Sequence, residues 1–194
     1  MDTESPDALD RQDMARLASG HDAALNDLME RHAPRLFNYL LRQLRDESEA
    51  EDLAQEAFVR VFQNRHKFNP QYRFMTWLYT IATNLARTRQ RHQTRHPHVS
   101  LEAESEFSIG SLKERLPAEQ SSPTENLETG ERAAAVRAAV ANLPEELREA
   151  ILLTEYEELT QREAAAVLNC TPKAVEMRIY HARNQLRQSL ASFF

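Results

Sequence analysis

Apolar side chains recur at intervals of three or four residues along most of this chain, which is the spacing of one buried stripe on an α-helix. In the first half of the chain, such stripes predict helices over about 25–44, 48–62 and 75–92. Pro34 cannot donate a backbone hydrogen bond, so the first stripe predicts either one helix or two. Ser48 and Glu51 have the spacing of a capping box, which predicts the start of the second helix.

The second half of the chain predicts four more helices and carries clear signals at their ends. These helices cover about 131–142, 145–155, 161–168 and 172–191. Thr160 and Glu163 form another capping box, and Asn169 readily takes the left-handed conformation that ends a helix. Thr171 followed by Pro172 supplies an N-cap and a proline at the first helical position. The last three helices therefore predict a helix, a turn, a short helix, a turn and a long helix.

Together these segments predict an all-α protein of two small helical domains. Residues 97–130 are rich in Glu, Ser and Pro and show little periodicity, which predicts an acidic flexible linker. We assign 21–96 to the first domain, 131–194 to the second and 1–20 to an N-terminal tail. Only 3 glycines occur among 194 residues, so sheet-rich folds with many tight turns fit poorly.

The apolar runs and the N-terminal composition indicate whether the protein enters a membrane or is secreted. No run approaches the roughly 20 apolar residues that cross a bilayer, and the acidic N-terminus is unlike a secretory signal. We therefore expect a cytoplasmic protein with no membrane insertion.

The residues that carry chemistry in enzymes and metal sites are sparse in this sequence. Cys170 is the only cysteine, so it forms neither an internal disulfide nor a CxxC metal site. Four histidines, at 66, 92, 96 and 98, form a pattern too weak to indicate a metal. No nucleophile is paired with a base, and no glycine loop could hold phosphate. We expect no catalytic residue, no metal, no cofactor and no enzyme activity.

The distribution of charge is uneven, although the net charge is −6. The stretch 57–101 holds eight of the 24 Lys and Arg residues and none of the 30 Asp and Glu residues. A basic surface inside an acidic protein indicates a nucleic-acid partner more strongly than the net charge argues against one.

The last three predicted helices have the order of a helix-turn-helix, whose second helix presents its first residues to base edges in the major groove. Its apolar stripe leaves six side chains outward, with three arginines beside them for phosphate contacts. The outward residues are Lys173, Glu176, Met177, Tyr180, His181 and Asn184, and the arginines are Arg178, Arg183 and Arg187. An ordinary amphipathic helix with a charged, solvated face is the alternative.

An acidic segment, 46–52, opens the second predicted helix. Asp52, Gln55 and Glu56 stand at positions i, i+3 and i+4, so they share one face of that helix. This face is either solvated and helped by the charge preference of a helix N-terminus, or a docking surface for a basic partner.

Three sets of residues together resemble the extracytoplasmic function (ECF) group of bacterial sigma factors. They are DLAQEAF at 52–58, TWLYTIATNLA at 76–86, and LPEE at 143–146 followed by LTQREAA at 159–165 and AVEMRIYHAR at 174–183. The resemblance covers about 20–95 and 130–191, and each motif falls on a helix already predicted.

The resemblance implies a transcription initiation factor. Its first domain binds core RNA polymerase and opens the −10 element of promoter DNA, and its second domain binds the −35 element. Carried over by position, the acidic face would meet a basic coiled coil of the largest polymerase subunit. The loop from Gln63 to Arg73 would meet the non-template strand, together with Tyr79, Thr80, Thr83, Asn84 and Arg87. An anti-sigma factor is also implied as a partner.

Four positions depart from the usual family pattern: Thr80, Thr88, Glu158 and Lys173. At the last two, the family often has glycine. These departures leave the implied fold unchanged, but the promoter sequence does not carry over from the family at these positions.

A two-domain helix-turn-helix regulator that never joins polymerase explains the C-terminal half equally well. The first domain discriminates between the two hypotheses. A sigma factor needs both an acidic docking face and a basic, aromatic-bearing helix, whereas such a regulator needs neither.

Overall fold

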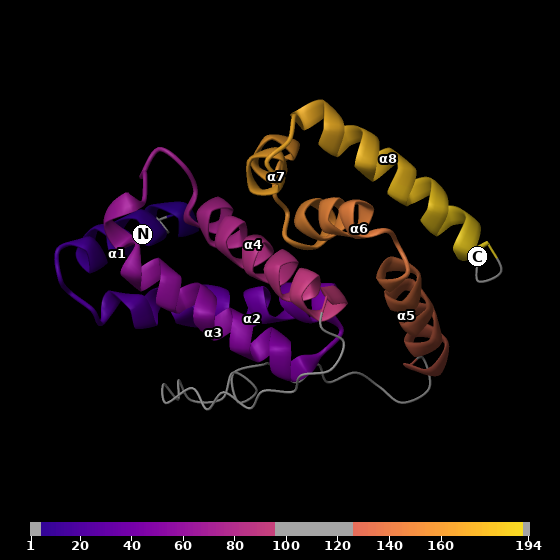
Figure 1. Ribbon diagram of the computed structural model, residues 1–194, viewed down its shortest axis with the longest axis horizontal. Helices are drawn as coiled ribbons and strands as arrows, with labels where there is room; N and C mark the ends of the chain where they lie inside the picture. The colour runs from indigo at the N-terminus through magenta and orange to yellow at the C-terminus, as the bar shows by residue number, and fades with distance from the viewer. Residues whose placement is uncertain (1–4, 96–125, 192–194) are drawn as a thin grey trace. The chain divides into compact units, whose positions relative to one another are not determined.

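The structure is a computed structural model that describes residues 5–95 and 126–191. Over these ranges the regular structure is helical, and the chain forms two compact units. The first unit contains α1 to α4 and the second contains α5 to α8 (Figure 1). The all-α fold with two helical domains is confirmed. Most of the predicted linker, 97–130, lies outside the described residues, and its last five residues already belong to α5.

The first unit is a bundle in which α2, α3 and α4 pack on one another (Figure 1). Its elements are α1 (Pro6–Ala18), α2 (Ala24–Leu44), α3 (Glu47–Gln63), the 3-10 turn η1 (Arg65–Lys67) and α4 (Phe74–Arg95). Pro34 lies inside α2, which is a single helix. Leu28 before it and Leu36 after it are both fully buried. Packing on both sides of Pro34 therefore keeps the helix continuous, although Pro34 cannot donate a backbone hydrogen bond.

Two expectations for the first unit are wrong. The N-cap of α3 is Asp46, whose Oδ1 accepts a hydrogen bond from the Glu49 amide, and the capping box expected at Ser48 does not start this helix. The expected tail at 1–20 contains α1, which packs on α2 and buries Met14 and Leu17. The apolar pattern of α1 is weak because aspartates make many of its contacts, as described below.

The second unit contains the predicted sequence of short helices. Its elements are α5 (Asn126–Ala141), α6 (Glu145–Ile151), the π-helical turn η3 (Leu152–Tyr156), α7 (Gln161–Leu168) and α8 (Pro172–Ser189). The capping box of Thr160 and Glu163 is confirmed, as are the left-handed Asn169 and the N-cap Thr171. These local contacts fix both ends of the turn between α7 and α8.

The helix expected over 145–155 changes character after Ile151, where the π-helical turn begins. Two residues past it, Glu158 has a φ of 55°, a conformation that glycine adopts without strain. The turn therefore needs a left-handed residue at the position where the family often has glycine. In the described ranges, no helix combines the length and apolar character needed to span a membrane.

Candidate nucleic-acid interface

The long helix α8 has one buried face and one exposed face. Val175, Ile179 and Ala182 are buried where α8 packs on α6 and α7. Of the six side chains predicted to point outward, Asn184 is half-buried and the other five are exposed: Lys173, Glu176, Met177, Tyr180 and His181. Met177 and Tyr180 are 42% and 59% exposed, which is unusual for large side chains with apolar surface. The outward orientation of this face is therefore confirmed.

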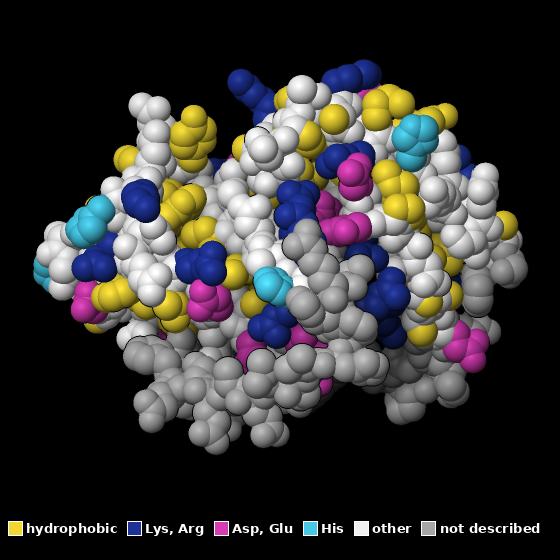
Figure 2. All heavy atoms as spheres, in the orientation of Figure 1, with side chains coloured by type: hydrophobic (Ala, Val, Ile, Leu, Met, Phe, Trp, Pro, Cys, Tyr) yellow, Lys and Arg dark blue, Asp and Glu magenta, His cyan; other side chains and the backbone are white. Residues whose placement is uncertain are grey.

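Two of the three arginines beside this face already have carboxylate partners. Arg178 Nη2 donates to Glu146 Oε2 on α6 at 2.9 Å, and Arg183 Nη2 donates to Glu155 Oε1 at 2.8 Å. Figure 2 shows one face of the molecule, with Lys and Arg in dark blue and Asp and Glu in magenta. A phosphate that binds either arginine must share it with a carboxylate or displace that carboxylate.

On α4, the predicted DNA-facing set is only partly exposed. Asn84 is exposed, and Thr80 and Arg87 are half-buried, so these three follow one outer stripe of the helix. Tyr79 and Thr83 are 1% and 0% exposed, so the prediction that they lie on the same exposed face is wrong.

Tyr39 on α2 explains why Tyr79 and Thr83 turn inward. Its ring meets that of Tyr79 edge to face at 5.0 Å, and its hydroxyl lies 2.8 Å from Thr83 Oγ1. The hydroxyls of Tyr39 and Thr83 thus satisfy each other inside the bundle, and Tyr79 and Thr83 position α4 rather than line its surface.

The loop between α3 and α4 combines basic and aromatic side chains. Phe68 packs 5.4 Å from Trp77 between ring centroids, and the Arg65 guanidinium lies 4.4 Å from the centroid of Phe62. Tyr72 is 62% exposed and Lys67 is exposed. The packed aromatics anchor a loop whose tip presents a ring and a positive charge to solvent, the combination that binds single-stranded nucleic acid.

The acidic face of α3 lies opposite its buried stripe. Asp52 is exposed, and Gln55 and Glu56 are half-buried. Glu56 Oε1 accepts a hydrogen bond from Arg60 Nε at 2.7 Å. The three residues do share one outer face of the helix, as their spacing predicts.

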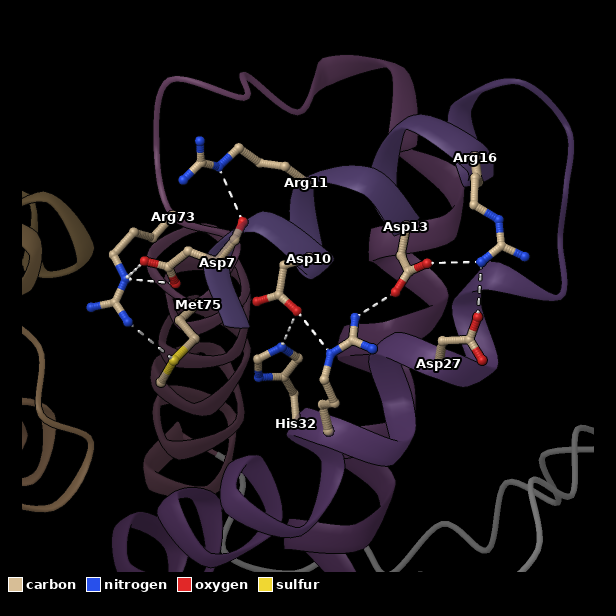
Figure 3. A network of polar contacts seen from close by, with 10 residues as sticks. Asp7, Asp10, Arg11, Asp13, Arg16, Asp27, His32, Arg73 and Met75 are labelled. Atoms are coloured by element: carbon tan, nitrogen blue, oxygen red, sulfur yellow. Dashed lines mark hydrogen bonds and ion pairs between the residues drawn. The ribbon is translucent and has the colours of Figure 1, made fainter. Parts of the chain in front are cut away.

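A network of polar contacts, missed by the sequence analysis, attaches α1 to the rest of the first unit (Figure 3). Asp7, Asp10 and Asp13 follow one another at intervals of three, so they face the same side of α1. Asp7 pairs with Arg73 at 2.9 Å, at the end of the loop before α4. The spacing was visible in the sequence, but apart from Arg16, which pairs with Asp13 three residues earlier, the basic partners lie 18 or more residues away.

Within this network, Arg31 bridges two carboxylates. It donates through Nε to Asp10 at 3.0 Å and through Nη2 to Asp13 at 2.6 Å. Burial acts to lower the pKa of Arg31, but the hydrogen bonds to Asp13 and Asp10 and the charges of both outweigh it and raise this pKa. His32 Nε2 lies 2.8 Å from the same Asp10 oxygen, and Asp10 is only 1% exposed.

We expect Asp10→Ala to lower the free energy of unfolding of the first unit by about 3 kcal/mol, because it removes the buried carboxylate of His32 and one of the two carboxylates that Arg31 bridges. Urea unfolding followed by Trp77 fluorescence measures this, since the chain's only tryptophan lies in that unit. Asp22→Ala, at an exposed turn residue, is the control. Equal midpoints for the two variants would mean that the network adds no stability.

Comparison with known proteins places this architecture in a family. The family model described as Sigma-70 region 2 matches residues 28–96, and that described as Sigma-70, region 4 matches 133–186. The RNA polymerase sigma-H factor of Pseudomonas aeruginosa is 31% identical over 185 residues, covering 93% of each chain. The ECF RNA polymerase sigma factor SigW of Bacillus subtilis is 31% identical over 176 residues, covering 90% of this chain and 93% of its own.

The chain belongs to the ECF family of sigma factors. A solved structure, that of CnrH in complex with the cytosolic domain of CnrY, matches this sigma factor with a TM-score of 0.68 and 28% identity. The match covers 95% of this sigma factor and 98% of the solved chain. The surfaces on α3, on α4 and on the loop between them lie in region 2 of this sigma factor, and the exposed face of α8 lies in region 4.

Proposed function

We propose that this sigma factor binds core RNA polymerase and directs it to promoters by contacting the −10 and −35 elements. The observation that carries the proposal is the match to two sigma-70 regions, in order, on two separate helical units. Catalysis of RNA synthesis belongs to the polymerase, and the site of action is the cytoplasm. The chain itself acts as a DNA-reading subunit.

Within region 2, the proposal gives separate roles to the two surfaces. The acidic face of Asp52, Gln55 and Glu56 docks on a basic surface of core polymerase. The outer stripe of α4, formed by Thr80, Asn84 and Arg87, meets the non-template strand of the −10 element together with the loop from Gln63 to Arg73. Exposed rings and cations suit a strand whose bases have left the duplex.

Within region 4, the exposed face of α8 enters the major groove of the −35 element. Its outward side chains read base edges, while Arg178 and Arg183 contact phosphate. We also propose an anti-sigma factor as a regulatory partner. The solved relative CnrH is described in complex with the cytosolic domain of CnrY, which supports a protein partner for this fold.

Run-off transcription with purified core polymerase tests the proposed function. We expect a defined transcript from promoters selected by the sigma factor and none from core enzyme alone. The alternative, a regulator that never joins polymerase, predicts DNA binding without core enzyme and no transcript. That outcome would overturn the proposal.

We expect Arg183→Ala to weaken binding to every −35 sequence alike and to reduce the slope of log affinity against log salt by about one unit. An arginine on phosphate displaces counterions but carries no sequence information. Fluorescence anisotropy of holoenzyme on labelled promoter DNA over a salt series measures the slope. Gln188→Ala, at an exposed position one turn further on, is the control. A loss confined to some sequences would contradict the phosphate assignment.

A further inference from the structure

Two oppositely charged side chains stand side by side at the start of α8. Lys173 Nζ donates to Glu176 Oε1 at 2.8 Å, and the two side chains are 71% and 51% exposed. This contact uses one ammonium proton and one carboxylate oxygen. The pair therefore still presents free donors on the Lys173 side and a free acceptor on the Glu176 side.

The major-groove edge of a base pair carries a donor and an acceptor at a similar spacing. In a G·C pair, guanine O6 accepts a hydrogen bond from cytosine N4, so these atoms lie about 2.9 Å apart. Guanine N7 adds a second acceptor beside O6. If the ammonium of Lys173 lies over O6 and N7 and the carboxylate of Glu176 lies over N4, the pair is complementary to every polar atom of that edge.

We propose that Lys173 and Glu176 act as one unit that reads a single G·C base pair of the −35 element, with guanine on the Lys173 side. The proposal rests on the proposed function, since it requires α8 to lie in the major groove. It goes beyond that function by naming the base pair, its orientation and the side chains that distinguish it.

The same chemistry ranks the other three base pairs at this position. In A·T, the N6 donor faces Lys173 and the O4 acceptor faces Glu176, so these two contacts are repulsive and only adenine N7 suits the ammonium. C·G reverses the preferred pattern, so the N4 donor faces Lys173, both guanine acceptors face Glu176, and every polar atom is mismatched. T·A has acceptor O4 and donor N6 on the correct sides, but its methyl group replaces guanine N7 beside the ammonium. We therefore expect G·C first, T·A second, and A·T and C·G last.

The contact between the two side chains also makes the carboxylate compatible with DNA. A lone carboxylate close to phosphates is repelled, whereas the adjacent ammonium of Lys173 cancels that charge. An exposed ion pair contributes little to helix stability, so folding gives little reason for the pair to stand here. The structure places it on the exposed side of α8, in the first two turns that a recognition helix presents to base edges.

The decisive experiment exchanges the two residues, Lys173→Glu with Glu176→Lys, which preserves both the ion pair and the net charge. Holoenzymes of wild type and variant each select active promoters from a library randomised across the −35 element. We expect wild type to favour G·C over C·G at one position by about tenfold, and the variant to reverse that ratio while other positions keep their preference.

The control introduces a similar pair elsewhere on α8, by Gln185→Lys with Gln188→Glu at two exposed positions. It should leave the selected motif unchanged, and circular dichroism melting checks that both variants fold. If the wild type selects a motif and the exchange reverses no position, the pairing proposal is overturned. If the wild-type holoenzyme selects no −35 sequence at all, the proposed function itself fails.

Discussion

Replacing Asp52 and Glu56 together by arginine should abolish binding to core RNA polymerase while the protein stays folded. Asp52 is exposed and Glu56 is half-buried, so neither substitution disturbs the core of the bundle. The change removes two negative charges and adds two positive ones, which then face the proposed basic docking surface. Loss of the Glu56 to Arg60 pair costs only about 0.5 kcal/mol, because both side chains are more than 40% exposed.

A native gel shift with core enzyme measures this effect. Asp22→Arg with Glu30→Arg makes the same change of charge at exposed positions of the same unit and is the control. The control should bind like wild type, which separates docking at α3 from a general effect of charge. Unchanged binding by the Asp52 and Glu56 variant would remove the docking assignment and favour the regulator hypothesis.

Asn84→Ala combined with Arg87→Ala should reduce open complexes on duplex promoters by about tenfold or more, with much less loss on templates already mismatched across −10. Both residues lie on the outer stripe of α4, where they would hold bases and backbone of the separated strand. In the proposed complex their contribution falls on the melting step, because that step creates the single strand that they would bind. Permanganate footprinting reports the unpaired thymines directly.

Arg11→Ala with Asn26→Ala removes the same residue types from exposed positions of α1 and α2 and controls for general effects. Equal losses on duplex and mismatched templates would show that Asn84 and Arg87 serve general binding and not strand opening. Tyr79 and Thr83 are unsuitable for this test, since their substitution disturbs the contact with Tyr39 inside the bundle.

The parts of this structure that could be predicted from the sequence are those decided by nearby residues. Thr160 caps α7 through an amide three residues away, and Asn169 and Thr171 set the turn by their own chemistry. The exposed face of α8 follows from its apolar period. At α3 two capping residues stood close together, and Asp46 took the role expected of Ser48.

The parts that could not be predicted depend on distant partners. Tyr79 and Thr83 have side chains suited to either face of a helix, and their burial depends on Tyr39, about 40 residues earlier. Similarly, Asp7 lies 66 residues from Arg73, and without that partner the start of α1 looks like a polar tail. Periodicity identifies apolar faces, but it gives no sign of ion pairs that attach a helix to residues far along the chain.

The arginines on α8 have a consequence for how long a promoter contact lasts. Arg178 and Arg183 each have a carboxylate partner in the free protein, so neither is left unpaired when DNA departs. In the proposed complex, each arginine exchanges its carboxylate for a phosphate, so the binding free energy gained is only the difference between the two ion pairs. This gain is smaller than the gain from an arginine that is unpaired in the free protein. The intramolecular partner also stays within reach of the bound arginine and favours the return exchange. Region 4 would therefore release its −35 site faster than a helix whose arginines are unpaired in the free protein.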